Sequence, residues 1–174
     1  MARIASLVLA VLVLTGATTG GDRAEVRPPT VPGAQEVDVV ALVVDERTRQ
    51  PTIVLEGKRD HRNLAMVIGF AEATGIAAPL QGVTPPRPLT HDLFLTLFGR
   101  LKVNLIRVVI NDLKGGVYYA TIVLSVDGSE LTLDSRPSDA IALAVRAKAP
   151  VYVEDRVFDR SSAPAPASPP APRI

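Results

Sequence analysis

The stretch Leu105–Val126, LIRVVINDLKGGVYYATIVLSV, decides the fold class of this chain. Two runs rich in β-branched residues, Leu105–Asp112 and Val117–Val126, flank the tripeptide Lys114-Gly115-Gly116. Such runs favour strands, and glycines between them favour a tight turn because glycine adopts positive φ without steric cost. The stretch therefore predicts a long antiparallel β-hairpin.

The residues before the hairpin predict three strands followed by two helices. Apolar runs bounded by polar turns indicate strands over Val37–Asp45, Pro51–Glu56 and Leu64–Ile68, arranged as an antiparallel meander. Apolar side chains at helical spacing then predict helices over Phe70–Gln81 and Thr90–Leu101.

The residues after the hairpin complete the fold class. Glu130–Asp134 and Pro150–Val153 have strand-like composition, and the Ala-rich segment Pro137–Lys148 between them predicts a third helix. Strands and helices are segregated along the chain instead of alternating. We expect an α+β fold: one compact domain with an antiparallel or mixed β-sheet and about three helices.

The two ends of the chain have the composition of export and linker segments. Residues 1–19, MARIASLVLAVLVLTGATT, combine Arg3, an apolar run over Ile4–Leu14 and small residues, in the order of a cleavable signal peptide. Residues 20–36 predict a Pro- and Gly-rich linker, and residues 160–174 a disordered Pro/Ala-rich tail. The folded domain is therefore expected over residues 37–159, in a protein exported to the periplasm or the extracellular space.

Composition and charge exclude several kinds of site. Cysteine is absent, which excludes disulfides, thiolate nucleophiles, Cys-based zinc sites and a Cys-linked lipid anchor. The apolar run near the start is also too short for a comfortable transmembrane helix, so we expect no stable membrane anchor. Residues 37–159 carry 14 Lys and Arg against 15 Asp and Glu, a net charge of −1. Proteins that bind nucleic acid through its backbone usually carry a basic patch, and none is visible in the sequence.

Two predicted helix starts share one pattern of residues. Each has Arg-Pro, then a hydroxyl residue, then an Asp in the first helical turn. The residues are Arg87, Pro88, Thr90 and Asp92 at one start, and Arg136, Pro137, Ser138 and Asp139 at the other. A helix N-terminus presents unpaired N–H groups and the positive end of its dipole, so a neighbouring arginine makes an anion pocket suited to phosphate. The alternative is that the hydroxyl and carboxyl groups only cap the two helices.

Longer motifs around these helix starts resemble a known family. Gly82–Leu93 (GVTPPRPLTHDL) and Asp134–Ala144 (DSRPSDAIALA), followed by Ala149–Val153 (APVYV), resemble the signature of the bifunctional nuclease domain family. Arg107–Leu113 is similar to the same family, and the resemblance covers about residues 37–156. It implies an α+β domain, often self-associating, with DNase and RNase activity in some members.

This chain departs from the family pattern in two respects. Gly75 and Pro79 interrupt a first helix that is usually smoother and Ala-rich. The family is mostly cytosolic, whereas we expect this chain to be exported. We nevertheless predict a nuclease that hydrolyses phosphodiester bonds of DNA or RNA and forms homo-oligomers. The alternative is a non-catalytic ligand-binding or regulatory module that holds a phosphorylated or anionic ligand at the two helix starts.

The candidate residues of the nuclease are assigned by their chemistry. Phosphate-binding residues are predicted at Arg87, Thr90, Arg136 and Ser138. The catalytic candidates are His91, as general acid or base, and the carboxylates Glu72, Asp92 and Asp139. The same three carboxylates are the candidates to bind a divalent cation such as Mg²⁺ or Mn²⁺, and Asp134 is expected to support one arginine. We expect one concavity surrounded by Arg87, His91, Asp92, Arg136 and Asp139, with Glu72 at its rim.

Overall fold

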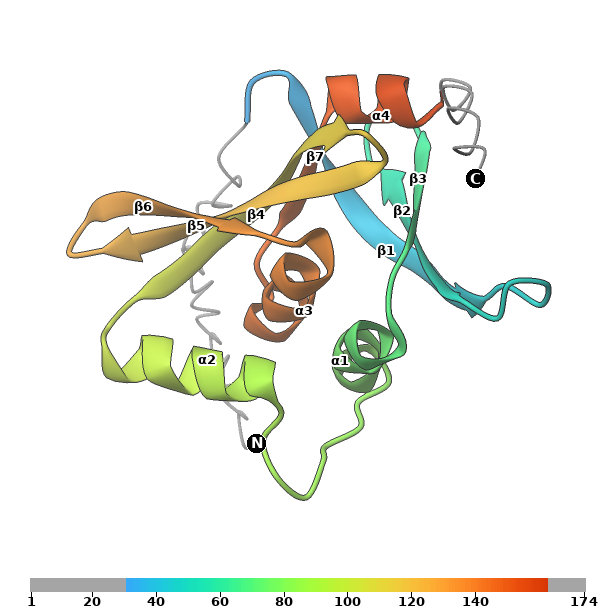
Figure 1. The fold of residues 1–174 in the computed structure, drawn as a ribbon. Helices are drawn as coiled ribbons and strands as arrows, with labels where there is room; N and C mark the ends of the chain where they lie inside the picture. Colours follow the sequence, from blue (N-terminus) through green and yellow to red (C-terminus); the bar gives the residue numbers. More distant parts are fainter. Residues whose placement is uncertain (1–30, 163–174) are drawn as a thin grey trace, which may run out of the picture.

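One mixed sheet of seven strands forms the scaffold of the molecule, and the computed structural model describes residues 31–162 (Figure 1). The strands are β1 Ala34–Val44, β2 Pro51–Gly57, β3 Asn63–Val67, β4 Asn104–Lys114, β5 Val117–Val126, β6 Ser129–Ser135 and β7 Val151–Glu154. They lie in the order β3-β2-β1-β7-β4-β5-β6. The predicted α+β class is confirmed.

The sheet consists of two antiparallel meanders joined by a short strand. The first meander is β1-β2-β3 and the second is β4-β5-β6. β7 lies between them, antiparallel to β1 and parallel to β4. Along β2 every second residue is buried, so one face of the strand packs on the core.

The turn between β4 and β5 has the conformation that its glycines predict. Gly115 and Gly116 have φ of 57° and 80°, in the left-handed region that glycine adopts without strain. Val117 then pairs with Lys114 across the turn. The predicted hairpin is therefore confirmed.

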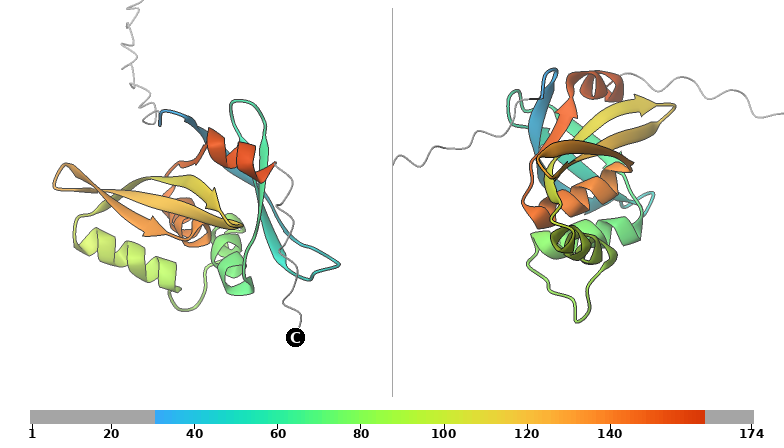
Figure 2. Two further views of the ribbon diagram at one scale, coloured as in Figure 1. Left: turned by 45° about the horizontal axis from the view of Figure 1, so that its top comes forward. Right: turned by 90° about the vertical axis from the view of Figure 1, so that its left-hand side faces the viewer.

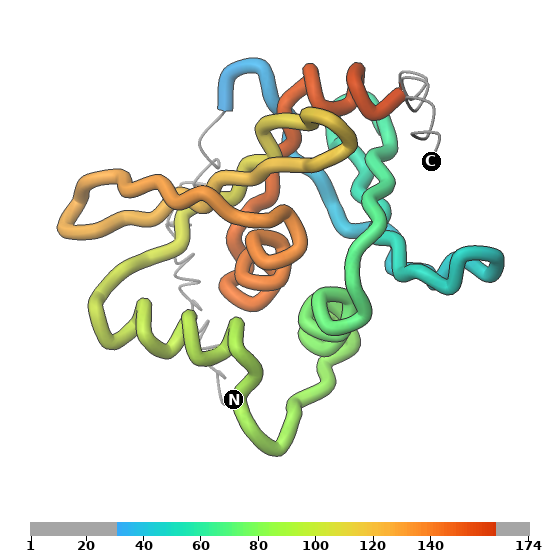
Figure 3. Tube along the Cα trace, in the orientation of Figure 1, coloured from blue at the N-terminus to red at the C-terminus, as the bar shows by residue number. Residues whose placement is uncertain are grey.

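Three helices lie on the same side of the sheet: α1 Phe70–Leu80, α2 Thr90–Arg100 and α3 Pro137–Ala147 (Figures 1 and 2). Each ends within one residue of its predicted bound. Helix α3 packs on β4 and β5, and its buried face includes Ala140, Ile141 and Ala144. Helices α1 and α2 both pack on α3. The segment between α1 and α2 extends away from the sheet before it returns to the start of α2 (Figure 3).

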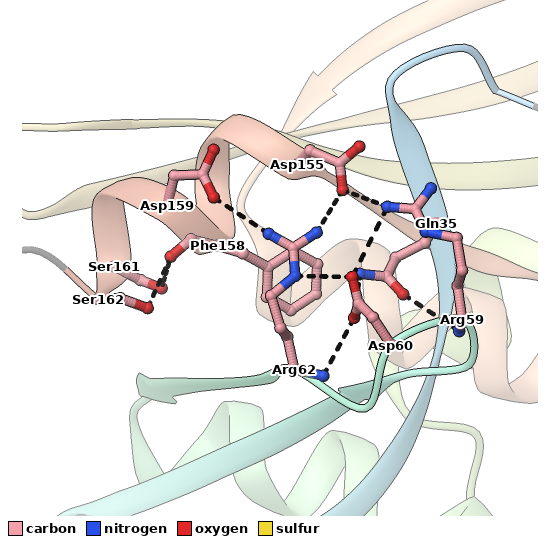
Figure 4. Close-up of polar contacts among 9 residues, drawn as sticks. All are labelled: Gln35, Arg59, Asp60, Arg62, Asp155, Phe158, Asp159, Ser161 and Ser162. Atoms are coloured by element: carbon pink, nitrogen blue, oxygen red, sulfur yellow. Dashed lines mark hydrogen bonds and ion pairs between the residues drawn. The ribbon is translucent and has the colours of Figure 1, made fainter.

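A fourth helix, α4 (Asp155–Ser161), is not predicted by the sequence. It has only seven residues, too few for a clear helical period. Tertiary contacts hold it instead: Phe158 is buried, and the Arg62 guanidinium carbon lies 4.6 Å from the centroid of its ring (Figure 4). Arg62 also donates hydrogen bonds to Asp155 at 2.5 Å and to Asp159 at 3.1 Å.

The folded body extends slightly beyond its predicted limits of 37–159. Strand β1 begins at Ala34, within the predicted linker, because Ala34 and Gln35 are buried. Helix α4 runs to Ser161, within the predicted tail, and Arg160 pairs with the buried Asp112. The predicted signal peptide and most of the predicted tail lie outside the described residues. Among residues 31–162 no helix is long and apolar enough to cross a membrane.

Candidate functional site

The first turns of α1, α2 and α3 meet at an open concavity of about 460 Å³. We call it the helix-start concavity. It is lined by Ala71, Glu72, Thr74, Gly75, Leu89, Thr90, His91, Arg136 and Asp139. Glu72 comes from α1, Thr90 and His91 from α2, and Asp139 from α3. Three segments far apart in sequence thus place ionisable side chains around one space.

Arg136 connects two of these helices through ion pairs. Its Nη1 donates to Glu72 Oε1 at 2.8 Å, and its Nε and Nη2 donate to the two Asp139 oxygens at 2.6 and 3.1 Å. The Asp139 bond, followed by the Glu72 bond, raises the pKa of the guanidinium. Its side chain is still 64% exposed, so the paired arginine faces solvent.

The two carboxylates stay ionised for different reasons. The pKa of Glu72 is lowered first by its own backbone N–H and then by the hydrogen bond from Arg136. Burial raises the pKa of Asp139, but the hydrogen bond and charge of Arg136 outweigh burial and lower it. Both side chains are therefore charged partners of Arg136 at neutral pH.

His91 lies between α1 and Asp139. Its Nε2 is 3.4 Å from Asp139 Oδ1, a long contact, and its side chain is 15% exposed. A Cβ added to Gly75 would come within 3.0 Å of His91 Cε1 and 3.3 Å of Nδ1. Glycine in the middle of α1 is thus explained, because the imidazole packs against the backbone where a side chain would otherwise stand.

Pro79 has a tertiary explanation as well. Proline lacks the N–H that would bond the carbonyl four residues earlier, and that carbonyl belongs to Gly75. Arg146 of α3 replaces the missing donor: its Nη1 donates to Gly75 O at 2.5 Å. Its Nε donates to Asp92 Oδ1 at 2.7 Å. The 7% exposed Arg146 side chain therefore joins all three helices.

Helix capping does not use the hydroxyl groups. The N-cap residues are Leu89 for α2 and Arg136 for α3, and neither helix has a side-chain hydrogen bond from its N-cap residue. Instead, the Asp92 carboxylate accepts the Leu89 N–H at 2.8 Å. Thr90 is thus not the N-cap that the sequence suggests, and it lines the helix-start concavity. Ser138 is buried and lines a different space.

Arg87 and Asp92 line a second concavity instead of the first. This Arg87 concavity measures about 440 Å³ and also includes Pro88 and Arg146. The residues of the single predicted concavity are therefore divided between two concavities, and both include residues at the start of α2. Arg87 is exposed and forms no ion pair with any residue between 31 and 162. It differs in this respect from Arg136.

Comparison with known sequences matches the part of the chain that contains the helices and most of the strands. The sequence model of the bifunctional nuclease domain matches residues 53–166, from β2 through α4 and beyond. The chain belongs to the bifunctional nuclease domain family. An uncharacterized protein of Mycobacterium tuberculosis strain H37Rv is 41% identical over 123 residues, which is 71% of this chain and 73% of the relative. Bifunctional nuclease 1 of Oryza sativa subsp. indica is 31% identical over 97 residues, 54% of this chain and 29% of the rice protein.

The carboxylates of this bifunctional nuclease domain do not form the predicted cation site. Among residues 31–162 no three His, Asp or Glu side chains come together in a group that could hold a metal ion. Arg136 lies between Glu72 and Asp139, so a guanidinium already takes the place of a cation there. Asp92 is paired with Arg146 and lines the other concavity. These donors do not fit a bound Mg²⁺ or Mn²⁺.

The expected contact between Asp134 and an arginine is not formed in residues 31–162. Asp134 is an exposed residue of β6 and pairs with neither Arg87 nor Arg136 in the part of the chain that the structure describes. Glu72 and Asp139 form the ion pairs with Arg136 instead. Conversely, the sequence does not predict Arg146 as a site residue. The one feature that could have drawn attention to it is its positive charge within the otherwise Ala-rich sequence of α3.

Proposed function

We propose that the chain hydrolyses phosphodiester bonds of RNA or DNA in the helix-start concavity. The observation that carries the proposal is the convergence of Arg136, His91 and Asp139 at one solvent-facing space. Membership of the bifunctional nuclease domain family supports the reaction class. The substrate and the activity are our proposal.

Arg136 is the proposed phosphate-binding residue. A guanidinium has five N–H donors in a fixed fork, and three hydrogen bonds to Glu72 and Asp139 use part of them. The side chain is 64% exposed, and we propose that its remaining donors bind two oxygens of one phosphate. Glu72 and Asp139 act as positioning residues because they hold the plane of the guanidinium.

His91 is the proposed general acid or base. Hydrolysis adds water across a P–O bond, so the attacking water loses a proton and the leaving oxygen gains one. An imidazole performs either transfer near neutral pH. Asp139 Oδ1 is positioned to orient the ring through Nε2, and the 3.4 Å contact is expected to tighten when substrate binds.

Arg87 is proposed to bind a neighbouring phosphate of the same strand. It is exposed, it has no ion pair among residues 31–162, and its concavity, like the helix-start concavity, includes residues at the start of α2. A substrate with successive phosphates would then cross the start of α2. This division of roles uses both Arg-Pro motifs.

The test is cleavage of total RNA and plasmid DNA by the purified chain. One reaction series contains EDTA and the other Mg²⁺. We expect His91→Ala to lower the cleavage rate by about 10²- to 10⁴-fold, the range of general acid–base catalysis. Arg136→Lys, which keeps the charge but removes the fork, should raise KM more than it lowers kcat.

The chain offers a matched control for each variant. His61, the second of its two histidines, pairs with Glu56 in a turn and is 76% exposed. Arg100 is an exposed residue in the last turn of α2. His61→Ala and Arg100→Lys should cleave at the original rate, and equal losses in the site variants and these controls would contradict the proposal.

A non-catalytic anion-binding module is the second candidate function. It is favoured by the net charge of −1 over residues 37–159, because a protein that binds a nucleic-acid polymer through its backbone usually carries a basic patch. Phosphate binding that requires Arg136, with no cleavage in either series, would support this candidate against hydrolysis.

A further inference from the structure

A second space is also lined by the Arg136–Glu72 ion pair. We call it the Tyr118 concavity, and it measures about 480 Å³. It is lined by Met66, Val67, Ile68, Gly69, Glu72, Gly116, Val117, Tyr118, Arg136, Pro137 and Ser138. Arg136 and Glu72 therefore line both this space and the helix-start concavity.

The chemistry of the two spaces differs. The helix-start concavity carries His91 and Asp139 in addition to the shared ion pair. The Tyr118 concavity carries aliphatic residues, one aromatic residue and Ser138 beside the shared ion pair. Its volume lies in the range of ~300–1,000 Å³ typical of small-molecule sites.

The rim of the Tyr118 concavity exposes apolar surface. Val67 is 62% exposed and Val117 is 55% exposed, although both line the same space. Clustered exposed apolar side chains beside polar groups are typical of a binding surface. Tyr118 is half-buried, packs against the core and places its hydroxyl 3.5 Å from Ala65 O. The ring is thus held in place before any ligand binds.

We propose that the Tyr118 concavity is a nucleobase subsite, an inference that rests on the phosphate-binding role proposed for Arg136. A nucleotide joins a charged phosphate to a flat, largely apolar base with polar edges. Here a phosphate-binding side chain borders an aromatic and aliphatic hollow, so one nucleotide would span the Arg136–Glu72 pair. Aromatic rings stack on every base, which predicts binding with little preference among the four bases. Ser138 and the backbone of Gly69 and Gly116 line the space where the polar edge of the base would lie.

The purely structural explanation of Tyr118 is that it closes the core beneath the β4–β5 hairpin. Its neighbour Tyr119 separates the two explanations because successive strand residues point to opposite faces. Tyr119 is 39% exposed, does not line the concavity and lies near Lys114. It is therefore a matched control for the loss of one tyrosine ring from β5.

The experiment measures dissociation constants of AMP, UMP and ribose 5-phosphate by calorimetric titration of the full chain. We expect both nucleotides to bind about tenfold more tightly than ribose 5-phosphate, as base–aromatic stacking predicts. Tyr118→Leu, which preserves apolar packing, should remove that advantage without changing the affinity for ribose 5-phosphate. Tyr119→Leu should keep it.

A second pair of variants tests the concavity independently, in case Tyr118→Leu does not fold. Val67→Asn changes an exposed rim residue, and Val44→Asn changes a β1 residue that is 52% exposed and does not line the concavity. The rim variant should weaken AMP binding several-fold, whereas the β1 variant should not. Melting temperatures of all four variants confirm that they are folded.

The outcomes separate this inference from the proposed hydrolysis. Equal affinity for AMP and ribose 5-phosphate, or equal losses in the two tyrosine variants, overturns the nucleobase subsite even if cleavage is observed. A Tyr118-dependent preference for AMP in a chain that cleaves neither RNA nor DNA supports the subsite and refutes only hydrolysis. If none of the three compounds binds, both the subsite and the Arg136 phosphate site are wrong.

Discussion

Replacing Gly75 by alanine should move the His91 side chain while changing the stability of the domain very little. The added Cβ would lie 3.0 Å from His91 Cε1, whereas ordinary contact begins at 3.4 Å. The imidazole must therefore move by about 0.4 Å, since the backbone of α1 carries the new atom rigidly. The contact of His91 with Asp139 is 3.4 Å long, already near the limit of hydrogen bonding, so a displacement of this size changes how the ring sits against its carboxylate partner.

The expected change in stability is small because two effects oppose each other. Alanine is favoured over glycine inside a helix by roughly 0.5–1 kcal/mol. Tight packing against His91 costs a similar amount, on the order of 1 kcal/mol. The free energy of unfolding of Gly75→Ala should therefore stay within about 1 kcal/mol of the original value, as measured by urea denaturation.

The position of His91 is measured by NMR of the imidazole Cε1–H groups. The chain has two histidines, so His61 serves as an internal reference. We expect the His91 resonance to shift while the His61 resonance stays, and phosphodiester cleavage to fall at least tenfold.

Gly99→Ala is the matched control because no atom lies within 4 Å of the Cβ that it would add to α2. It should stabilise the domain by roughly 0.5–1 kcal/mol without moving either histidine. The reasoning is refuted if Gly75→Ala gains as much stability as Gly99→Ala and leaves the His91 resonance unchanged.

Three further predictions concern the helices, the α4 contacts and the N-terminus. Arg146→Met should lower the free energy of unfolding by about 3 kcal/mol, because it leaves Asp92 and a helix carbonyl unpaired; Arg100→Met, measured in the same urea titration, should change it little. Burial raises the pKa of Asp60, but hydrogen bonds from Gln35 and Arg62 lower it to about 2. The contribution of the ionised Asp60 to the free energy of unfolding is therefore complete above about pH 4 and is lost as the pH falls toward 2. Asp60→Asn should therefore flatten the decline of the melting temperature in that window, and an unchanged slope would contradict this. Mass spectrometry of the mature protein should find an N-terminus within about residues 16–26, whereas intact chains starting at Met1 would refute export.

Most secondary structure of this domain is predictable from local sequence. The β4–β5 hairpin follows from glycines at two positions of positive φ between β-branched runs, which is a property of neighbouring residues. The three main helices follow from apolar spacing in the same way and end within one residue of their predicted bounds. Helix α4 is the exception, because it is short and held by Arg62, more than 90 positions away.

The candidate site is only partly predictable from the sequence. Glu72, His91, Arg136 and Asp139 line one concavity, as expected. The expected anion site shared by Arg87 and Arg136 is not formed, because the two arginines line separate concavities. The sequence could not assign Arg87 to a separate concavity, since that depends on how α2 packs on α3.

The chain sequence by itself determined the strands, the three main helices and the residue types available for chemistry. Only the tertiary structure decided which charges neutralise one another. Glu72 and Arg136 are 64 positions apart, and Gly75 and Arg146 are 71 positions apart. Turns and periodic patterns act between near neighbours in the chain, whereas ion pairs depend on distances in space that only packing sets. For this reason Gly75 and Pro79 look like defects in a helix until His91 and Arg146 are seen beside them.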